Sequence, residues 1–330
     1  MYQGLKTKLT ANNIIIISPN SIFEQYISNV LPELGEDNIV CAVFDDLLGD
    51  IIKDRAIEPR NDFLEHMIAD SPYKNVRKRS MEWKTSKSFQ EILDRFLQDI
   101  PYQWIEFDDI YYEGSCIVSK ETLKAKFTIL GDMHQTLEKK EDLSLYHQIR
   151  KILNKKKASL VTLEKSFRCT NEILEFSLSF LPQDQAIKSF NRNGAAPQVL
   201  AVDSAEAFID AIGTEVTYCL EQGFRSIGLI CKTQSNSARL WETIKSRMNV
   251  QLIGNETVSD LQGVFIIPVY MAKGLEFDAV IICDADSQNY RSEDDKSLLY
   301  VACTRALHKL SLFCENEISP LIQAIPVSRG

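Results

Sequence analysis

Residues 264–283 have the sequence VFIIPVYMAKGLEFDAVIIC, in which two apolar runs flank a short segment that carries charges. The runs 264–269 and 278–283 are apolar at nearly every position, so neither shows the alternation of a strand with one side in water. Strands that are apolar on both sides are typical of a parallel sheet covered by helices. The stretch therefore predicts two buried parallel strands joined by a polar loop.

The rest of the second half continues this pattern. Further apolar strands are predicted at 159–163, 198–202, 226–231 and 309–313. Segments with helical apolar spacing separate them at 171–180, 205–222, 235–248 and 296–307. Strands and helices in alternation predict an α/β domain with a parallel sheet. In the first half the clearer predictions are strands at 12–18, 41–44 and 127–130 and helices at 22–31, 61–69 and 86–100.

The composition is that of a globular protein rather than a disordered one. The 330 residues are 45% apolar and 25% charged, which is enough for two domains with their own cores. No apolar run approaches the roughly 20 residues of a membrane helix, and residues 1–8 lack the apolar core of a signal peptide. We therefore expect a cytoplasmic protein that does not contact a membrane. Eight widely spaced cysteines, with no C-x-x-C pair, predict buried reduced thiols rather than a metal site or a disulfide framework.

The net charge of −9 argues against a surface coated with basic residues for nucleic acid. It still allows a local basic track, because phosphates are bound by patches of charge. The densest basic stretch is 74–87, which holds six basic residues, one glutamate and Trp83. This stretch is interpreted either as a solvated surface or as a phosphate contact.

Polar residues follow two of the predicted strands. Asp132 and Gln135 come after the strand 127–130, and ligands of open parallel sheets lie beyond the carboxyl ends of their strands. A glutamine in this position can orient a water molecule against a terminal phosphate, although the same sequence is also typical of a turn. Arg168, after the strand 159–163, is interpreted either as a surface ion pair or as a cation that neutralises charge on a transferred phosphate.

The polar loop of residues 272–278 offers a second set of candidates. Gly274 permits close backbone approach, and Glu276 can hydrogen-bond a ribose hydroxyl. Arg305 lies near the end of the predicted helix 296–307, where a cation also compensates the helix dipole. Each of these fragments is weak evidence for a nucleotide site by itself, so the fragments have to be interpreted together.

Taken in order, the segments FTILGDMHQ (127–135), LEKSFR (163–168), AKGLEFD (272–278) and LLYVACTRA (298–306) resemble motifs III, IV, V and VI of the UvrD/Rep-type superfamily 1 helicases. More narrowly, residues 18–35 and 268–273 resemble the HelD branch, whose members are helicase-like ATPases that associate with bacterial RNA polymerase. The resemblance implies a RecA-like parallel sheet domain preceded by an incomplete RecA-like lobe. The expected domains are residues 1–157, a remnant of the first lobe, and 158–330, the second lobe.

The resemblance also implies roles for single residues. The residues expected to act on or bind ATP are Gln135, Arg168 and Arg305 at the γ-phosphate, and Asp132, Gly274 and Glu276 elsewhere on the nucleotide. The residues expected to contact nucleic acid are Ser18, Pro19, Asn20, Tyr270 and Lys273. No metal ligand is predicted. The expected cofactor is ATP with Mg²⁺, and the expected partner is nucleic acid, with DNA favoured over RNA.

The departures from the family pattern are as informative as the matches. The chain contains no Gly-Lys dipeptide, so the phosphate loop of such ATPases is absent from it. It also contains no Asp-Glu dipeptide to hold Mg²⁺; either Asp108 and Asp109 substitute for it, or a deletion near 123–126 has removed it. Pro268 and Tyr270 stand where the common motif V has Thr and His, as is usual in the HelD branch.

These departures predict that the chain binds ATP weakly and is not an active ATPase by itself. The expected function is to supply the second half of an ATP site and nucleic-acid contacts in a helicase or translocase. The alternatives are a non-catalytic module that docks on RNA polymerase or on a partner carrying the phosphate loop, and a gene remnant without function.

Overall fold

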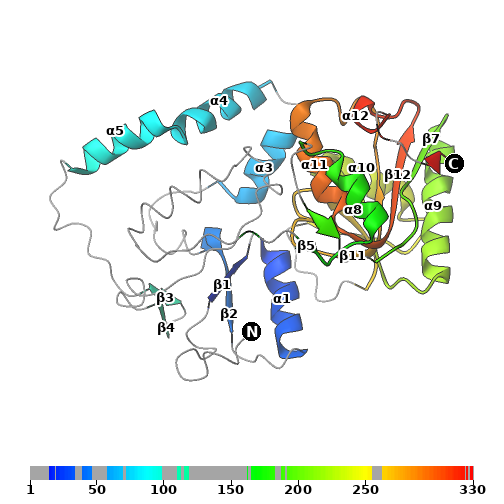
Figure 1. Cartoon of the computed structure of the whole chain (residues 1–330), viewed down its shortest axis with the longest axis horizontal. Coiled ribbons are helices and arrows are strands. Elements are labelled where there is room, and N and C mark those ends of the chain that lie inside the picture. Colours follow the sequence, from blue (N-terminus) through cyan, green and yellow to red (C-terminus); the bar gives the residue numbers. More distant parts are fainter. Residues whose placement is uncertain are drawn as a thin grey trace. The chain divides into compact units, whose positions relative to one another are not determined.

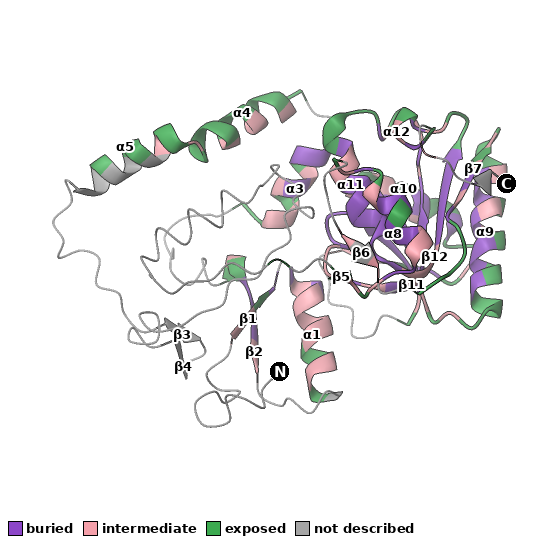
Figure 2. Cartoon of the chain, viewed as in Figure 1, coloured by how far each residue is buried: buried purple, intermediate pink, exposed green. Residues whose placement is uncertain are grey.

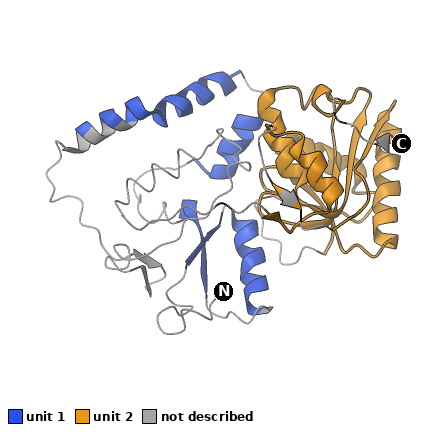
Figure 3. Cartoon of the chain, viewed as in Figure 1, with its two compact units in different colours: residues 1–131 blue, residues 132–330 orange. Residues whose placement is uncertain are grey.

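The computed structural model describes residues 15–18, 20–33, 39–46, 58–69, 72–98, 110–112, 115–118, 162, 165–182, 187–189, 192–254, 262–323, 325 and 328–329. The chain divides into two compact units, Met1–Gly131 and Asp132–Gly330 (Figure 3). The domain boundary expected after residue 157 lies outside the described residues.

The first unit contains a short parallel strand pair. Strand β1 (Ile15–Ser18) lies beside β2 (Val40–Val43), and helix α1 (Ser21–Glu33) connects them and contacts both. The remaining described elements of this unit are α3 (Arg60–Ile68), α4 (Lys74–Lys84), α5 (Lys87–Gln98) and the antiparallel pair β3 (Ile110–Tyr112) and β4 (Ser115–Val118). The strands and helices predicted up to residue 100 are present within a few residues of their expected bounds. The strand expected at 127–130 lies outside the described residues.

The second unit is built on a seven-stranded, fully parallel sheet (Figure 1). The strand order is β13-β7-β12-β11-β8-β10-β9. The strands are β7 (Gln198–Val202), β8 (Ser226–Cys231), β9 (Gln251–Leu252), β10 (Gly263–Pro268), β11 (Phe277–Ile282), β12 (Ala306–Glu315) and β13 (Ser328–Arg329). The predicted α/β fold class is confirmed, and the sheet is consistent with a RecA-like helicase domain. The strand predicted at 159–163 lies outside the described residues.

Helices cover the buried strands, as their apolar sequences predict. Helices α9 (Ala205–Glu221) and α10 (Gln234–Ile244) pack on one side of the sheet, against alternate strand residues such as Leu229 and Ile281. The intervening residues, such as Ile230 and Ile282, are also buried. Helix α11 (Glu293–Cys303) packs on β11, β12 and α8 (Asn171–Leu178). Burial of consecutive strand residues explains why these strands show no polar alternation.

Helix α11 differs from its predicted range of 296–307. It begins at Glu293, because Ser292 and Asp295 form a reciprocal capping box at its first turn. It ends at Cys303, because Ala306 already belongs to β12 and lies opposite Phe277 of β11. The prediction that Arg305 lies within the helix was therefore wrong: Arg305 occupies the turn between α11 and β12.

Two expectations about composition can be compared with the structure. The seven cysteines whose side chains are described are all buried and free, which confirms the prediction of buried thiols. Within the part of the chain that the structure describes, no helix is both long and apolar enough to cross a membrane.

Candidate functional site

Two of the predicted site residues meet at the amino end of the central strands. Phe277 begins β11 and Ala306 begins β12, and these two residues are paired in register. The backbone N–H of Phe277 donates to the carbonyl oxygen of Arg305 over 2.9 Å. Glu276 and Arg305, which immediately precede the two strands, are therefore held at one edge of the sheet, which we call the amino edge.

Arg168 reaches the same place from a distant part of the sequence. Its Nε lies 2.5 Å from Oε1 of Glu276, in an ion pair whose side chains are 33% and 30% exposed. Arg192 supports the pair, because its Nη2 donates to the carbonyl oxygens of Arg168 (2.8 Å) and Leu307 (2.5 Å). A partly exposed ion pair of this kind can be opened by a ligand that binds both charges.

Arg305 is different from Arg168, since its side chain is fully buried. Its guanidinium donates from Nε to the carbonyl of Val301 at 3.0 Å, from Nη1 to that of Leu275 at 3.3 Å, and from Nη2 to Oγ1 of Thr304 at 3.1 Å. Hydrogen bonds to fixed acceptors offset the cost of burying this charge. Because Leu275 precedes Glu276, Arg305 fixes the backbone that carries the exposed carboxylate.

The loop before Glu276 makes a tight turn. Gly274 has a φ of 96°, which glycine adopts without strain, and the N–H of Leu275 donates to the carbonyl of Ala272 over 3.0 Å. Tyr270 is buried in this loop and Lys273 is half-buried. Of the two residues expected to contact nucleic acid here, Lys273 has the more accessible side chain.

The remaining predicted site residues lie in the first unit or outside the described residues. Ser18 and Asn20 are buried in the first unit, where Ser18 Oγ donates to the carbonyls of Asn20 (3.2 Å) and Ala42 (3.4 Å). The side chain of Asn20 accepts from the N–H of Phe23 over 2.8 Å and so caps α1. Pro19, Asp132 and Gln135 lie outside the described residues.

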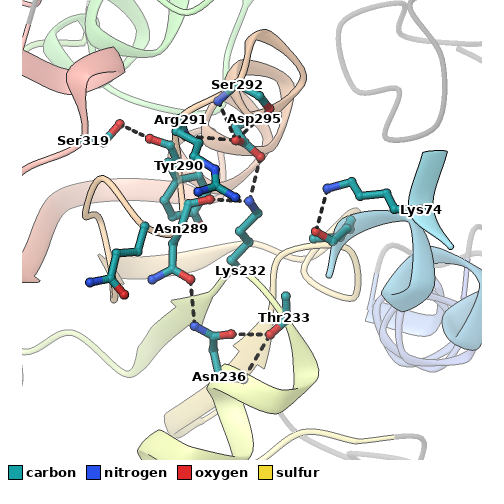
Figure 4. Close-up of polar contacts among 12 residues, drawn as sticks. Lys74, Lys232, Thr233, Asn236, Asn289, Tyr290, Arg291, Ser292, Asp295 and Ser319 are labelled. Atoms are coloured by element: carbon teal, nitrogen blue, oxygen red, sulfur yellow. Dashed lines mark hydrogen bonds and ion pairs between the residues drawn. The ribbon is translucent and has the colours of Figure 1, made fainter. Parts of the chain in front are cut away.

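A second polar cluster, which the sequence interpretation missed, lies at the carboxyl ends of β8 and β11 (Figure 4). Its centre is a buried ion pair between Nζ of Lys232 and Oδ1 of Asp295, 2.8 Å apart. Lys232 also donates to the carbonyl of Asn289, and its ammonium lies 5.5 Å from the ring centroid of Tyr290. Oδ2 of Asp295 accepts from the N–H groups of Ser292 (2.8 Å) and Arg291 (3.0 Å). Burial opposes the charged form, but Lys232 and these N–H groups outweigh it and lower the pKa of Asp295.

The remainder of this cluster joins α10 to the turn after β11. Nδ2 of Asn236 donates to Asp284 over 2.9 Å and to Oδ1 of Asn289 over 3.1 Å, and Thr233 caps α10 at the same point. Asp284 has a φ of 58°, and burial raises the pKa of its carboxyl group. The buried hydroxyl of Tyr290 has no hydrogen-bond partner among the described residues. A sequence signal existed: Lys232 and Asp284 closely follow apolar strands, which is where open parallel sheets place functional side chains.

The arrangement of the two clusters limits their chemistry. The amino edge presents an accessible cation and carboxylate, which suit a phosphate and a hydroxyl group. The cluster around Lys232 is internally paired and buried, so it fixes the ends of α10 and α11. Within the described residues, no group of three or more His, Cys, Asp or Glu side chains could hold a metal ion.

Comparison with protein families gives a match over the segment that links both clusters. Residues 263–313 match the UvrD-like helicase C-terminal domain. The UvrD-like segment runs from β10 to β12 and contains Glu276, Asp295 and Arg305, whereas Arg168 and Lys232 lie before it.

One similar solved structure is the C-terminal domain of a possible DNA helicase from Lactobacillus plantarum WCFS1. It is 32% identical, with a TM-score of 0.43, over 49% of this chain and 94% of that chain. Comparison with curated proteins found no match. The coarser part of the predicted family, a UvrD-like helicase C-terminal domain, thus has support from the family match.

Proposed function

We propose that this chain supplies one half of an ATP site in a UvrD-like, ATP-dependent nucleic-acid translocase. The half-site consists of Arg168 and Glu276 at the amino edge, with Arg305 as the buried support beneath them. The family match over residues 263–313 and the convergence of these side chains at one edge both favour this function.

The ion pair between Arg168 and Glu276 is the observation that carries the proposal. Arginine is suited to phosphate oxygens because its planar guanidinium donates several hydrogen bonds at once. A carboxylate beside it can accept hydrogen bonds from the ribose hydroxyls. Phe167, next to Arg168, is 65% exposed and offers a ring against which a purine base can stack. When ATP binds, the ion pair between Arg168 and Glu276 would open, and each side chain would contact the nucleotide instead.

A partner that carries a phosphate loop would supply the other half of the site. Backbone amides and a lysine of a phosphate loop bind the β- and γ-phosphates in such enzymes, and carboxylates hold Mg²⁺. The chain has neither a Gly-Lys nor an Asp-Glu dipeptide to supply them. We therefore expect weak ATP binding by this chain and no turnover without a partner that carries the phosphate loop.

Photo-crosslinking with 8-azido-ATP at millimolar concentration tests the half-site, because it detects weak but specific binding. We expect labelling of the wild-type chain to fall several-fold in Arg168→Ala and Glu276→Gln. Arg247→Ala is the matched control, since Arg247 is a half-exposed arginine whose described ion pair is with Asp210, at 3.1 Å, and not with Glu276. Equal labelling of all four proteins would contradict the proposal.

The finer assignment to the HelD branch rests on the sequence segments 18–35 and 268–273. It suggests bacterial RNA polymerase as a partner, either beside the nucleotide function or in place of it as a docking module. Two results together would favour the docking module. The chain would co-purify with RNA polymerase even after Arg168→Ala, and it would not be labelled in the crosslinking experiment.

A further inference from the structure

Helix α4 of the first unit has a surface that the nucleotide half-site does not use. Its 11 residues include five basic side chains and a single acidic one, Glu82, in a chain whose net charge is −9. None of its residues is buried, whereas the preceding helix α3 buries Leu64, Met67 and Ile68. Figure 2 shows α4 half-buried to exposed along its length.

The two sides of α4 have different surroundings. On one side, Arg77 pairs with Glu58 at 2.8 Å and Lys74 donates to the carbonyl of Ile68, so these cations are used within the unit. On the other side, Val76, Arg79 and Trp83 succeed one another at intervals of three and four residues and so share one helix face. Lys84 follows Trp83 at the C-terminal end of the helix and lies seven residues after Arg77, so it projects on the Arg77 side of α4.

Large apolar groups are unusually exposed on this face. Tyr73, just before the helix, is 71% exposed, Val76 is 66% exposed and Trp83 is 54% exposed. The ring of Trp83 rests on Phe89, with the centroids 4.6 Å apart, so one side of the indole is supported. Arg79 and Lys84 have no ion-pair partner within the part of the chain that the structure describes. A face with supported aromatic rings between cations differs from an ordinary solvated helix.

We propose that the face of α4 formed by Val76, Arg79 and Trp83, together with Lys84 at the C-terminal end of the helix, binds single-stranded nucleic acid. The cations would lie against backbone phosphates, and an unpaired base would stack on Trp83, because stacking needs a base whose face is not covered by neighbours in a duplex. This inference deepens the proposed function by naming a nucleic-acid contact, but it requires neither ATP nor the half-site.

The test measures binding of a fluorescein-labelled oligothymidylate to the full chain by anisotropy, without nucleotide. We expect Arg79→Ala/Lys84→Ala to reduce the slope of log affinity against log salt by about 1.4, since each phosphate contact in a single strand contributes about 0.7. Trp83→Ala should weaken binding about 5- to 100-fold, the range for loss of one stacked base, and Trp83→Phe should recover most of it.

Matched controls separate this face from general charge effects. Lys245→Ala/Arg247→Ala removes the same charge from half-exposed positions at the end of α10, and we expect it to leave the salt slope unchanged. Quenching of tryptophan fluorescence by the oligonucleotide should be lost in Trp83→Phe and kept in Trp241→Phe. If the α4 variants bind as the controls do, the proposal is overturned, and an acidic protein surface becomes the better occupant of α4. Equal binding of a duplex and a single strand would overturn the stacking role.

Discussion

Arg168 and Arg305 are both expected at the γ-phosphate from sequence, but their surroundings indicate different roles. Arg168 is one-third exposed and pairs with a carboxylate that is equally accessible. Arg305 is fully buried and bonds two backbone carbonyls and one hydroxyl. In the geometry described here, Arg168 is the residue that a nucleotide can reach, and Arg305 positions the loop that carries Glu276.

This difference predicts losses of stability of different size for two alanine substitutions. Arg305→Ala removes the described donor to the buried carbonyl of Leu275, whereas the carbonyl of Val301 still accepts from Oγ1 of Thr304. We therefore expect the free energy of unfolding to fall by about 1–3 kcal/mol for the unsatisfied carbonyl, and further because a fully buried side chain is lost. Arg168→Ala removes a partly exposed ion pair, which contributes about 1 kcal/mol or less. Urea denaturation of both variants measures the difference. Similar midpoints for the two would show that Arg305 is not the buried support described here.

At the scale of elements, α11 is fastened at both ends. Its first turn is tied to the end of β8 by the Lys232–Asp295 pair, and the residues after its last turn are tied to the loop before β11 by Arg305. The helix thus spans from the carboxyl ends of the strands to the amino edge. Its position determines where the carboxylate of Glu276 lies.

Asp295, which is buried, and Asp284, which is 14% exposed, are expected to respond differently to the same Asp→Asn substitution. Asp295→Asn leaves Lys232 buried without its counter-ion, so we expect the free energy of unfolding to fall by about 3–5 kcal/mol. Asp284→Asn keeps an acceptor for Asn236 and removes a charge whose burial raises the pKa of Asp284, so stability at neutral pH should be unchanged or higher. Thermal denaturation of the pair measures both effects.

The pH dependence follows from the same pKa shifts. Because the pKa of Asp295 is lowered by folding, its contribution is complete above the unfolded carboxyl value of about 3.9 and is lost as the pH falls through the lower folded value. The wild-type chain should therefore lose this contribution in acid, and Asp295→Asn should show a flatter profile there. An unchanged acid profile in Asp295→Asn would argue against the buried pair.

The elements whose bounds were predicted most closely from sequence are strands whose side chains are buried on both faces of the sheet. Strands β8, β10 and β11 were expected within one residue of their bounds, because consecutive apolar residues signal burial on both faces. Helix α4 was not among the helices predicted from sequence, because it has no buried stripe to give helical periodicity, and its basic stretch was interpreted only as a solvated surface or a phosphate contact. The end of α11 was misplaced, because pairing of Ala306 with Phe277 depends on a strand distant in sequence.

The candidate site could be predicted only in part. Motif resemblance led to Arg168, Glu276 and Arg305, which the structure brings to one edge, but not to the difference in burial between the two arginines. The cluster around Lys232 combines Lys232 and Asp284, which follow β8 and β11, with Asp295 of α11. The apolar strands before Lys232 and Asp284 mark each residue separately, but the local sequence does not show that the three lie together. Only the parallel sheet topology makes such residues neighbours.

At the scale of the whole molecule, the two units carry different features. The second unit holds the UvrD-like segment, the parallel sheet and the proposed nucleotide half-site. The first unit holds the paired strands β1 and β2 and the basic, aromatic face of α4. A chain with half of a nucleotide site and a separate nucleic-acid surface would depend on a partner for ATP turnover.

The most direct measurement is steady-state ATP hydrolysis by the purified full chain with Mg²⁺ and saturating single-stranded DNA. We predict no turnover above background and no difference between the wild-type chain and Arg168→Ala. Hydrolysis that DNA stimulates and that Arg168→Ala abolishes would contradict this prediction, because the chain would then contain a complete ATP site.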